Sequence, residues 1–236
     1  MTHLHFNTNY FEALIRNAQS QVPTKEKARD PLAEIIQMAL GTACTIYVWH
    51  GPNQWTGSGF HIGDGVIVTA GHVVPPELEQ NSEARVAVSF DKKELLPSQV
   101  LISDPDTDCA LLMCKQIANS VPRVLLGNSD EAMVGDQITV ISSPEGWHGT
   151  ATTGRITNIH QALGSNAPSQ AWNDIMFIDA DILQGSSGGM CLGTDGLVYG
   201  SIVGVTGQHA DIGIGESSVC PSNKIMEIVE QYKHNR

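Results

Sequence analysis

The sequence predicts an all-β fold of two packed lobes, with a helical N-terminal extension and a C-terminal helix. Beyond Thr42, short β-branched runs alternate with glycine turns at intervals of roughly ten residues, which is typical of a β-sandwich or barrel. By contrast, residues 31–40 and 222–232 carry apolar side chains at helical spacing. The stretch 125–130 has the composition of a surface connection, which indicates two β lobes rather than one.

The N-terminal segment, residues 1–40, is predicted to be a helical extension. Apolar residues recur at helical spacing in the segments 10–16 and 31–40. In the second segment Asp30 can act as the N-cap, with Pro31 in the first turn. The extension could plug a cleft, mediate homo-oligomerisation or dock a regulatory partner, and nothing in its residues chooses among these.

The remainder of the chain is assigned to two lobes and a closing helix. Residues 41–124 form the first lobe, and in them the run 84–90 alternates apolar with more polar side chains, as expected for a half-buried strand. Residues 125–220 form the second lobe, which contains the hairpin signal Asp195-Gly196. Residues 221–236 form the C-terminal helix.

Composition excludes several functional classes. The formal net charge is −12 and no Lys/Arg cluster is present, which argues against a nucleic-acid partner. No apolar run reaches the ~18 residues that a membrane-spanning helix needs. The N-terminus lacks the basic patch and apolar core of a signal peptide. The prediction is therefore a cytoplasmic protein, and the alternative is an export signal that is absent here or unconventional. The five cysteines lack CxxC spacing and are interpreted as reduced, buried thiols.

Three residues could form a nucleophilic serine site. Ser187 lies in the glycine-rich stretch 185–189, with His72 and Asp108 upstream, and the order His, Asp, Ser is a known order for catalytic triads. A serine hydroxyl needs a base to become a nucleophile, and an imidazole held by a carboxylate can supply it. The backbone N–H groups of Gly185 and Ser187 are the expected oxyanion-hole donors.

These motifs resemble those of the chymotrypsin-like serine proteases, most closely the HtrA/Deg branch. The resemblance covers roughly residues 42–232. It is carried by the segments 57–60, 68–74, 104–112, 134–136, 141–146, 185–189 and 218–223.

The resemblance implies two packed six-stranded antiparallel β-barrels of the chymotrypsin type. It also implies a serine endopeptidase that hydrolyses peptide bonds of a protein or peptide substrate through an acyl-enzyme on Ser187. In this assignment His72 is the general base and Asp108 orients it. No cofactor is expected.

The chain departs from the family pattern in two places. Ser186 precedes the nucleophile where the digestive enzymes have an aspartate that pairs with a newly cut N-terminus, so activation of that kind is not expected. The sequence ends with the closing helix, so regulation by a PDZ module within this chain is not expected either.

Substrate preference depends on a second set of residues. Asp181 lies six residues before Ser187, where trypsin-like enzymes place the carboxylate that receives Lys or Arg. We therefore hypothesise cleavage after basic residues, and the alternative is a pocket for small aliphatic side chains, as in HtrA relatives. Val203, Gly204 and Val205 are expected to border the pocket and to pair with an extended substrate.

Other types of site fit the sequence less well. The stretch 185–189 also matches the G-x-S-x-G elbow of α/β-hydrolases, but β-like runs follow the serine and the best histidine motif precedes it. The aspartates at 104, 106 and 108 mimic a calcium loop, which Cys109 and Lys115 at its sixth and twelfth positions exclude.

Two further interpretations concern a metal site and an inactive domain. His50 and His61 lack a second close pair of ligands, so no metal site is expected. A catalytically latent or inactive protease-like domain used for protein binding is the alternative to an active enzyme.

Overall fold

The computed structural model describes residues 30–78, 84–91, 93–162, 173–206 and 216–234. The helix predicted over residues 10–16, and with it most of the N-terminal extension, lies outside the described residues. The described residues from Leu32 onward belong to one compact unit.

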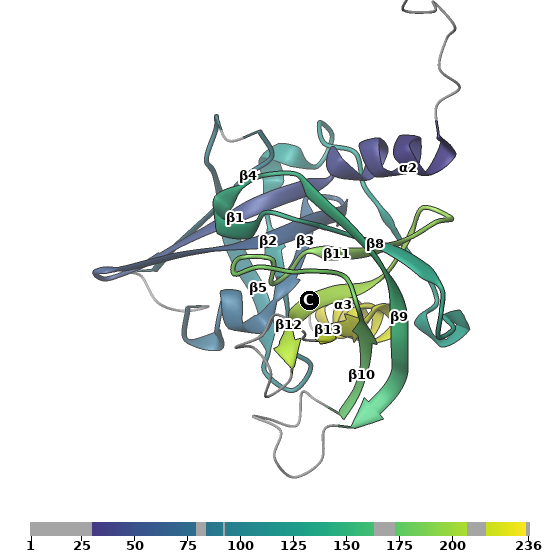
Figure 1. Ribbon diagram of the computed structural model, residues 1–236. Coiled ribbons are helices and arrows are strands. Elements are labelled where there is room, and N and C mark those ends of the chain that lie inside the picture. The colour runs from purple at the N-terminus through teal and green to yellow at the C-terminus, as the bar shows by residue number, and fades with distance from the viewer. Residues whose placement is uncertain (1–29, 79–83, 92, 163–172, 207–215, 235–236) are drawn as a thin grey trace, which may run out of the picture. The chain divides into compact units, whose positions relative to one another are not determined.

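The first barrel is a closed antiparallel sheet of six strands in the order β1-β2-β3-β6-β5-β4 (Figure 1). Each strand pairs with its two neighbours, and β4 closes the barrel onto β1 through pairs such as Thr45↔Ser89. The strands are β1 (Ala43–His50), β2 (Asn53–Gly63), β3 (Val66–Ala70), β4 (Ala84–Ser89), β5 (Leu96–Asp104) and β6 (Cys109–Met113).

The second barrel has six antiparallel strands in the order β11-β8-β9-β10-β13-β12 and closes through pairing of β11 with β12. A short seventh strand, β7, runs parallel to the start of β12. The strands are β7 (Leu125–Leu126), β8 (Gln137–Ser142), β9 (Thr150–Ala162), β10 (Asn173–Ile178), β11 (Met190–Gly193), β12 (Leu197–Thr206) and β13 (Glu216–Pro221).

Two α-helices are described, and short 3₁₀ turns connect the strands. Helix α2 (Pro31–Leu40) precedes β1, and α3 (Ser222–His234) follows β13 directly. The C-terminal helix, yellow in Figure 1, packs beside β12 and β13 and also contacts β5 and β6 of the first barrel. The 3₁₀ turns are η1 (Gly71–Val73), η2 (Pro76–Leu78), η3 (Lys115–Ile117), η4 (Ser129–Glu131) and η5 (Pro144–Gly146).

Three hydrophobic cores hold this arrangement together. One fills the first barrel around Ile46, Ile67 and Leu112, and another fills the second barrel around Ile178 and Ile202. The third combines both barrels with the two helices. Its members include Ala39, Phe60, Val68, Leu111, Ile141, Met190, Leu192, Ile225 and Ile228.

The predicted fold class is therefore confirmed, with two closed six-stranded antiparallel barrels and flanking helices. The domain boundaries at residues 40/41, 124/125 and 220/221 stay predictions. Among the described residues, no helix is both long and apolar enough to cross a membrane.

Candidate active site

The first barrel contributes a histidine–aspartate pair. His72 lies on η1 directly after β3, and Asp108 lies directly before β6, which is the neighbour of β3 in the barrel. Asp108 Oδ2 is 2.8 Å from His72 Nδ1, and its Oδ1 accepts the His72 backbone N–H at 2.7 Å. The histidine side chain is 50% exposed and that of the aspartate 15%, so the ring is partly accessible from solvent.

Local backbone contacts fix this pair. Asp108 has a φ of 50°, and its carbonyl accepts the N–H of Gly71 at 2.9 Å. Asp104 accepts hydrogen bonds from the N–H of Asp106 and the hydroxyl of Thr107, each at 2.9 Å, and so shapes the turn that ends at Asp108. An aspartate tolerates this left-handed conformation better than most residues do.

Ser187 lies on the loop between β10 and β11 of the second barrel. Its hydroxyl donates to the Val203 carbonyl at 3.3 Å, and its own carbonyl accepts the N–H of Ser58 at 2.8 Å. Ser187 and His72 are not hydrogen bonded to each other in the described part of the chain. A change of the serine χ1 rotamer would redirect the hydroxyl while the loop stays in place.

The backbone around Ser187 presents two unpaired donors. The Gln184 carbonyl accepts the N–H of Glu145, and the Ser186 carbonyl accepts the N–H of Gly189, both at 2.9 Å. In a trans peptide the N–H points away from the C=O. The N–H groups of Gly185 and Ser187 therefore point away from these anchors, and within the described residues they donate to no acceptor.

Two glycines are required for this loop. Gly185 and Gly188 have φ angles of +87° and +85°, which side-chain-bearing residues rarely adopt. At Gly188 a Cβ would collide with the Ser58 carbonyl and the Thr69 hydroxyl. Only a glycine therefore lets the loop approach the first barrel this closely.

Ser186, which precedes Ser187, is 1% exposed. Its Oγ accepts hydrogen bonds from the hydroxyl of Ser142 at 3.2 Å and from the N–H of Leu183 at 3.3 Å. The position is thus part of a buried neutral network, in keeping with the absence of an aspartate there.

The predicted substrate-binding residues lie on the β10–β11 loop, which also carries Ser187, and on β12. Asp181 is exposed, and its carbonyl accepts the Thr152 hydroxyl at 2.9 Å. Val203 is buried, and the carbonyl of Gly204 accepts the Ser218 hydroxyl at 2.8 Å. Val205 pairs with Ser217 in the ladder between β12 and β13.

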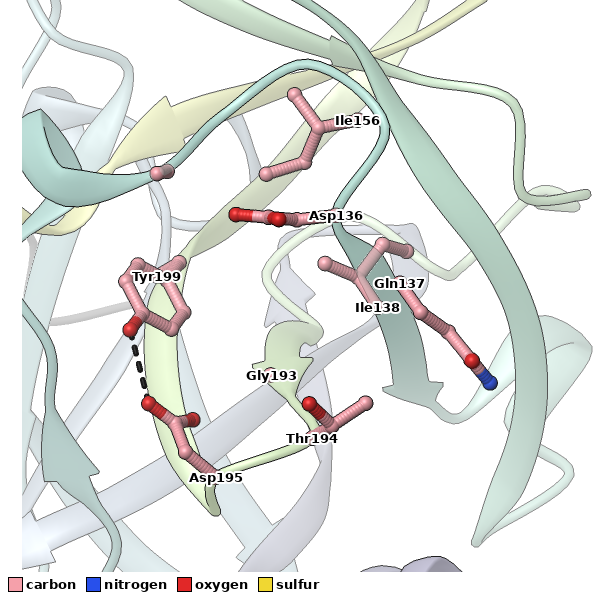
Figure 2. A pocket seen from close by; sticks show the side chains of 9 residues that line it. Asp136, Gln137, Ile138, Ile156, Gly193, Thr194, Asp195 and Tyr199 are labelled. Carbon is pink, nitrogen blue, oxygen red and sulfur yellow. Dashed lines mark hydrogen bonds between the residues drawn. The ribbon is translucent and has the colours of Figure 1, made fainter.

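A cavity of about 170 Å³ lies at the opposite end of β11 (Figure 2). Asp136 and Asp195 face it, but both carboxylates are already engaged by backbone donors. Asp136 accepts the N–H of Met133, and Asp195 accepts the N–H of Leu197 as well as the hydroxyl of Tyr199. The two carboxylates that line the cavity are therefore explained as hydrogen-bond acceptors that stabilise local turns.

His61, which was considered as a metal ligand, has a structural role. His61 is 1% exposed, its Nε2 accepts the N–H of Gly65 at 3.1 Å, and its Nδ1 lies 2.9 Å from the Pro122 carbonyl. The first contact places the ring proton on Nδ1, which leaves no nitrogen for a metal. Among the described residues, no group of three or more His, Cys, Asp or Glu could hold a metal ion.

All five cysteines are free and buried. Burial raises the pKa of the Cys191 thiol to about 12, so this thiol stays protonated and unreactive at neutral pH. The hydroxyl of Ser58 donates to the Gly185 carbonyl at 2.7 Å, a contact with the Ser187 loop that the sequence did not predict, although the Gly57-Ser58-Gly59 motif supported the resemblance.

Comparison with known proteins identifies related sequences and folds. The "Trypsin-like peptidase domain" family matches residues 57–200, which is more than half of the chain. A "Probable periplasmic serine endoprotease DegP-like" of Pseudomonas fulva (strain 12-X) is 33% identical over 184 residues, covering 76% of this chain and 35% of that protein. Its counterpart in Chlamydia pneumoniae is 35% identical over 178 residues, covering 74% and 34%.

Solved structures share the fold at lower sequence identity. The HtrA-type protease AlgW with tripeptide matches with a TM-score of 0.74 and 23% identity, over 87% of this chain and 64% of that chain. A serine endoprotease from Yersinia pestis matches with a TM-score of 0.70 and 21% identity, over 87% and 68%.

The relatives also correct one prediction. The chain spans about a third of the length of the curated relatives it matches, and these are named periplasmic. The predicted cytoplasmic location is therefore wrong. It depended on the composition of the N-terminal residues, which does not determine where the folded domain works. The fold, the motifs and the family match agree, and the chain belongs to the trypsin-like peptidase family, as its resemblance to the HtrA/Deg proteases predicted.

Proposed function

We propose that this chain is a serine endopeptidase whose catalytic groups are Ser187, His72 and Asp108. The observation that supports it best is the double hydrogen bond of Asp108 to the ring and the backbone of His72, at 2.8 and 2.7 Å. That geometry leaves the Nε2 lone pair of the neutral imidazole as the available base.

The proposed reaction follows from these contacts. The Ser187 hydroxyl turns from Val203 towards His72, gives its proton to Nε2 and attacks the scissile carbonyl carbon. The N–H groups of Gly185 and Ser187 stabilise the oxyanion that forms. The imidazolium, stabilised by Asp108, then protonates the leaving amine, and water cleaves the acyl-enzyme by the same steps in reverse order.

Labelling with a fluorophosphonate tests this proposal and separates it from the alternative of a latent or inactive binding module. The wild-type chain should be labelled, and Ser187→Ala should not. Ser89→Ala is a suitable control, because Ser89 is fully buried and its hydroxyl has no described partner. Equal labelling of the wild type and Ser187→Ala would contradict Ser187 as the nucleophile, and no labelling of either would contradict an active enzyme.

We further propose that Asp181 helps to select the residue before the cut bond and that Val203–Val205 pair with the extended substrate. The exposure of Asp181 on the loop that leads to Ser187 supports the first part. Profiling with a peptide library tests it. Enrichment of Lys or Arg that is lost in Asp181→Asn agrees with the proposal, whereas enrichment of small aliphatic residues in both proteins contradicts it.

Proteins or peptides are the proposed substrates, and no role for a nucleic acid or a membrane is proposed. The extension, residues 1–40, is proposed to contact a second copy or a regulatory partner, since α2 exposes Met38 to 68%. Sedimentation of the full chain over a concentration range should show self-association, and a monomer at all concentrations would leave only the regulatory partner.

A further inference from the structure

Ser58 is a buried polar residue of the first barrel that forms hydrogen bonds with the β10–β11 loop of the second barrel, which carries Ser187. It lies on β2 and is 1% exposed. Its backbone N–H donates to the Ser187 carbonyl at 2.8 Å, and its hydroxyl donates to the Gly185 carbonyl at 2.7 Å. One residue thus holds two peptide groups of the loop, one on each side of Ser186.

The direction of the Ser58 hydroxyl is fixed by a third contact. The N–H of Ser143 donates to Ser58 Oγ at 2.8 Å. A serine hydroxyl has one proton, and with Ser143 supplying a donor this proton is free to point to the Gly185 carbonyl. The Ser58 carbonyl in turn accepts the hydroxyl of Thr69, from the strand that leads into His72.

The Gly185–Ser186 peptide, to which Ser58 bonds, lies between the two unpaired donors of the loop. Its N–H also donates to the Leu183 carbonyl at 3.0 Å, so it is anchored at both ends. The preceding peptide supplies the Gly185 N–H, and the following one supplies the Ser187 N–H. A rotation of the middle peptide would therefore turn both donors out of alignment.

We infer that Ser58 is a positioning residue, whose hydroxyl keeps the Gly185 and Ser187 N–H groups aimed at a developing oxyanion. The inference rests on the proposed endopeptidase function. It assigns to Ser58 an effect on the transition state rather than on substrate affinity, because its side chain faces the loop backbone and not the substrate.

Kinetics of Ser58→Ala test this role. The substitution leaves the backbone bond to Ser187 intact and removes the hydroxyl. Misplaced donors should lower kcat by about 10- to 100-fold, with KM changed less than about 3-fold. Affinity for a peptide aldehyde, whose tetrahedral adduct on Ser187 uses the same donors, should fall by about the same factor as kcat. Ser89→Ala serves as the control, because it removes another buried serine hydroxyl of the same barrel.

Hydrogen exchange of the loop separates this inference from the proposed function. Amides of residues 183–190 should exchange faster in Ser58→Ala than in the wild type or Ser89→Ala, whether or not the protein cleaves peptides. Loss of activity in Ser187→Ala but not in Ser58→Ala would overturn the role of Ser58 alone. Unchanged exchange, or unchanged aldehyde affinity alongside a reduced kcat, would also overturn it.

If Ser58→Ala does not fold, Ser58→Cys replaces it. A thiol of similar size is a weaker donor, so an intermediate loss of kcat of roughly 3- to 10-fold is expected. A kcat equal to that of the wild type would show that the hydroxyl bond to Gly185 is not needed.

Discussion

At the scale of the residue, Asp108 has two tasks that a neutral isostere could not both perform. Its Oδ1 accepts the backbone N–H of His72 and so places the residue, and its Oδ2 faces Nδ1 and so sets the tautomer. The backbone N–H of His72 needs one acceptor, which an amide oxygen could also supply. Nδ1–H needs a second acceptor at the same time, so both oxygens of the carboxylate are required.

Asp108→Asn should therefore keep the fold and lose most of the activity. With the amide oxygen on the backbone N–H, the amide nitrogen would face Nδ1 and force the ring proton to Nε2. We expect kcat to fall on the order of 10,000-fold. Peptide hydrolysis at neutral pH measures this, with Asp106→Asn as an exposed neighbouring control. Retention of a tenth of the activity would contradict the assignment.

Gly188 and Gly135 separate backbone strain from steric collision. Both have positive φ, +85° and +98°, but a Cβ at Gly188 meets the first barrel and one at Gly135 meets nothing. Gly135→Ala should cost roughly 1–2 kcal/mol of unfolding free energy, and Gly188→Ala about 3 kcal/mol or more. Urea unfolding measures the difference. Equal losses of unfolding free energy would show that the first barrel can move away from a Cβ at residue 188 without loss of stability.

At the scale of the element, the β11–β12 hairpin carries a titratable contact (Figure 2). Burial, then the hydrogen bond to Asp195 and nearby carboxylates raise the pKa of Tyr199 from 10.0 to about 12. A raised pKa means that the folded state favours the neutral hydroxyl. Its contribution to stability is therefore complete below the unfolded pKa of 10.0 and is lost as the pH rises towards about 12.

The unfolding free energies of the wild type and Tyr199→Phe should reflect this. The advantage of the wild type should be constant up to about pH 9 and should shrink above it. Urea unfolding of both proteins across this range measures the effect. A difference that stays constant to about pH 11.5 would show that the pKa is not raised by folding.

The elements also show what could be predicted from sequence and what could not. The hairpin at Asp195-Gly196 was predictable because its turn chemistry is local, and Gly196 has the expected positive φ of 83°. The strand predicted over residues 84–90 is present as β4, but the prediction that it is half-buried was wrong. Ala87 and Ser89, which should face solvent, are buried, because side chains this small can be covered on the outer face as well.

The same distinction applies to the candidate site. His72, Asp108 and Ser187 could be named in advance because each belongs to a recognisable local motif. The bond from Ser58 to Gly185 joins residues 127 positions apart and depends on which loop of the second barrel reaches β2. Such a contact has no local pattern, since small polar residues between glycines occur in many turns.

At the scale of the whole molecule, the site depends on the packing of two barrels. His72 and Asp108 belong to the first and Ser187 to the second, and the shared core joins both with α3. Ile225 and Ile228 of α3 are at most 1% exposed within this core. Loosening the core should therefore affect the stability of both barrels and the geometry of the site together.

Ile225→Ala tests this coupling. Removing three buried carbons should cost about 3 kcal/mol of unfolding free energy. Peptidase activity and tryptophan fluorescence should then be lost at the same, lower urea concentration, because neither barrel buries this surface alone. Glu227→Ala, an exposed change on the same helix, should leave both midpoints unchanged. Loss of activity at a clearly lower urea concentration than the loss of fluorescence would contradict this coupling. It would show that the barrels separate before they unfold, so that the shared core aligns the site but does not make the molecule one cooperative unit.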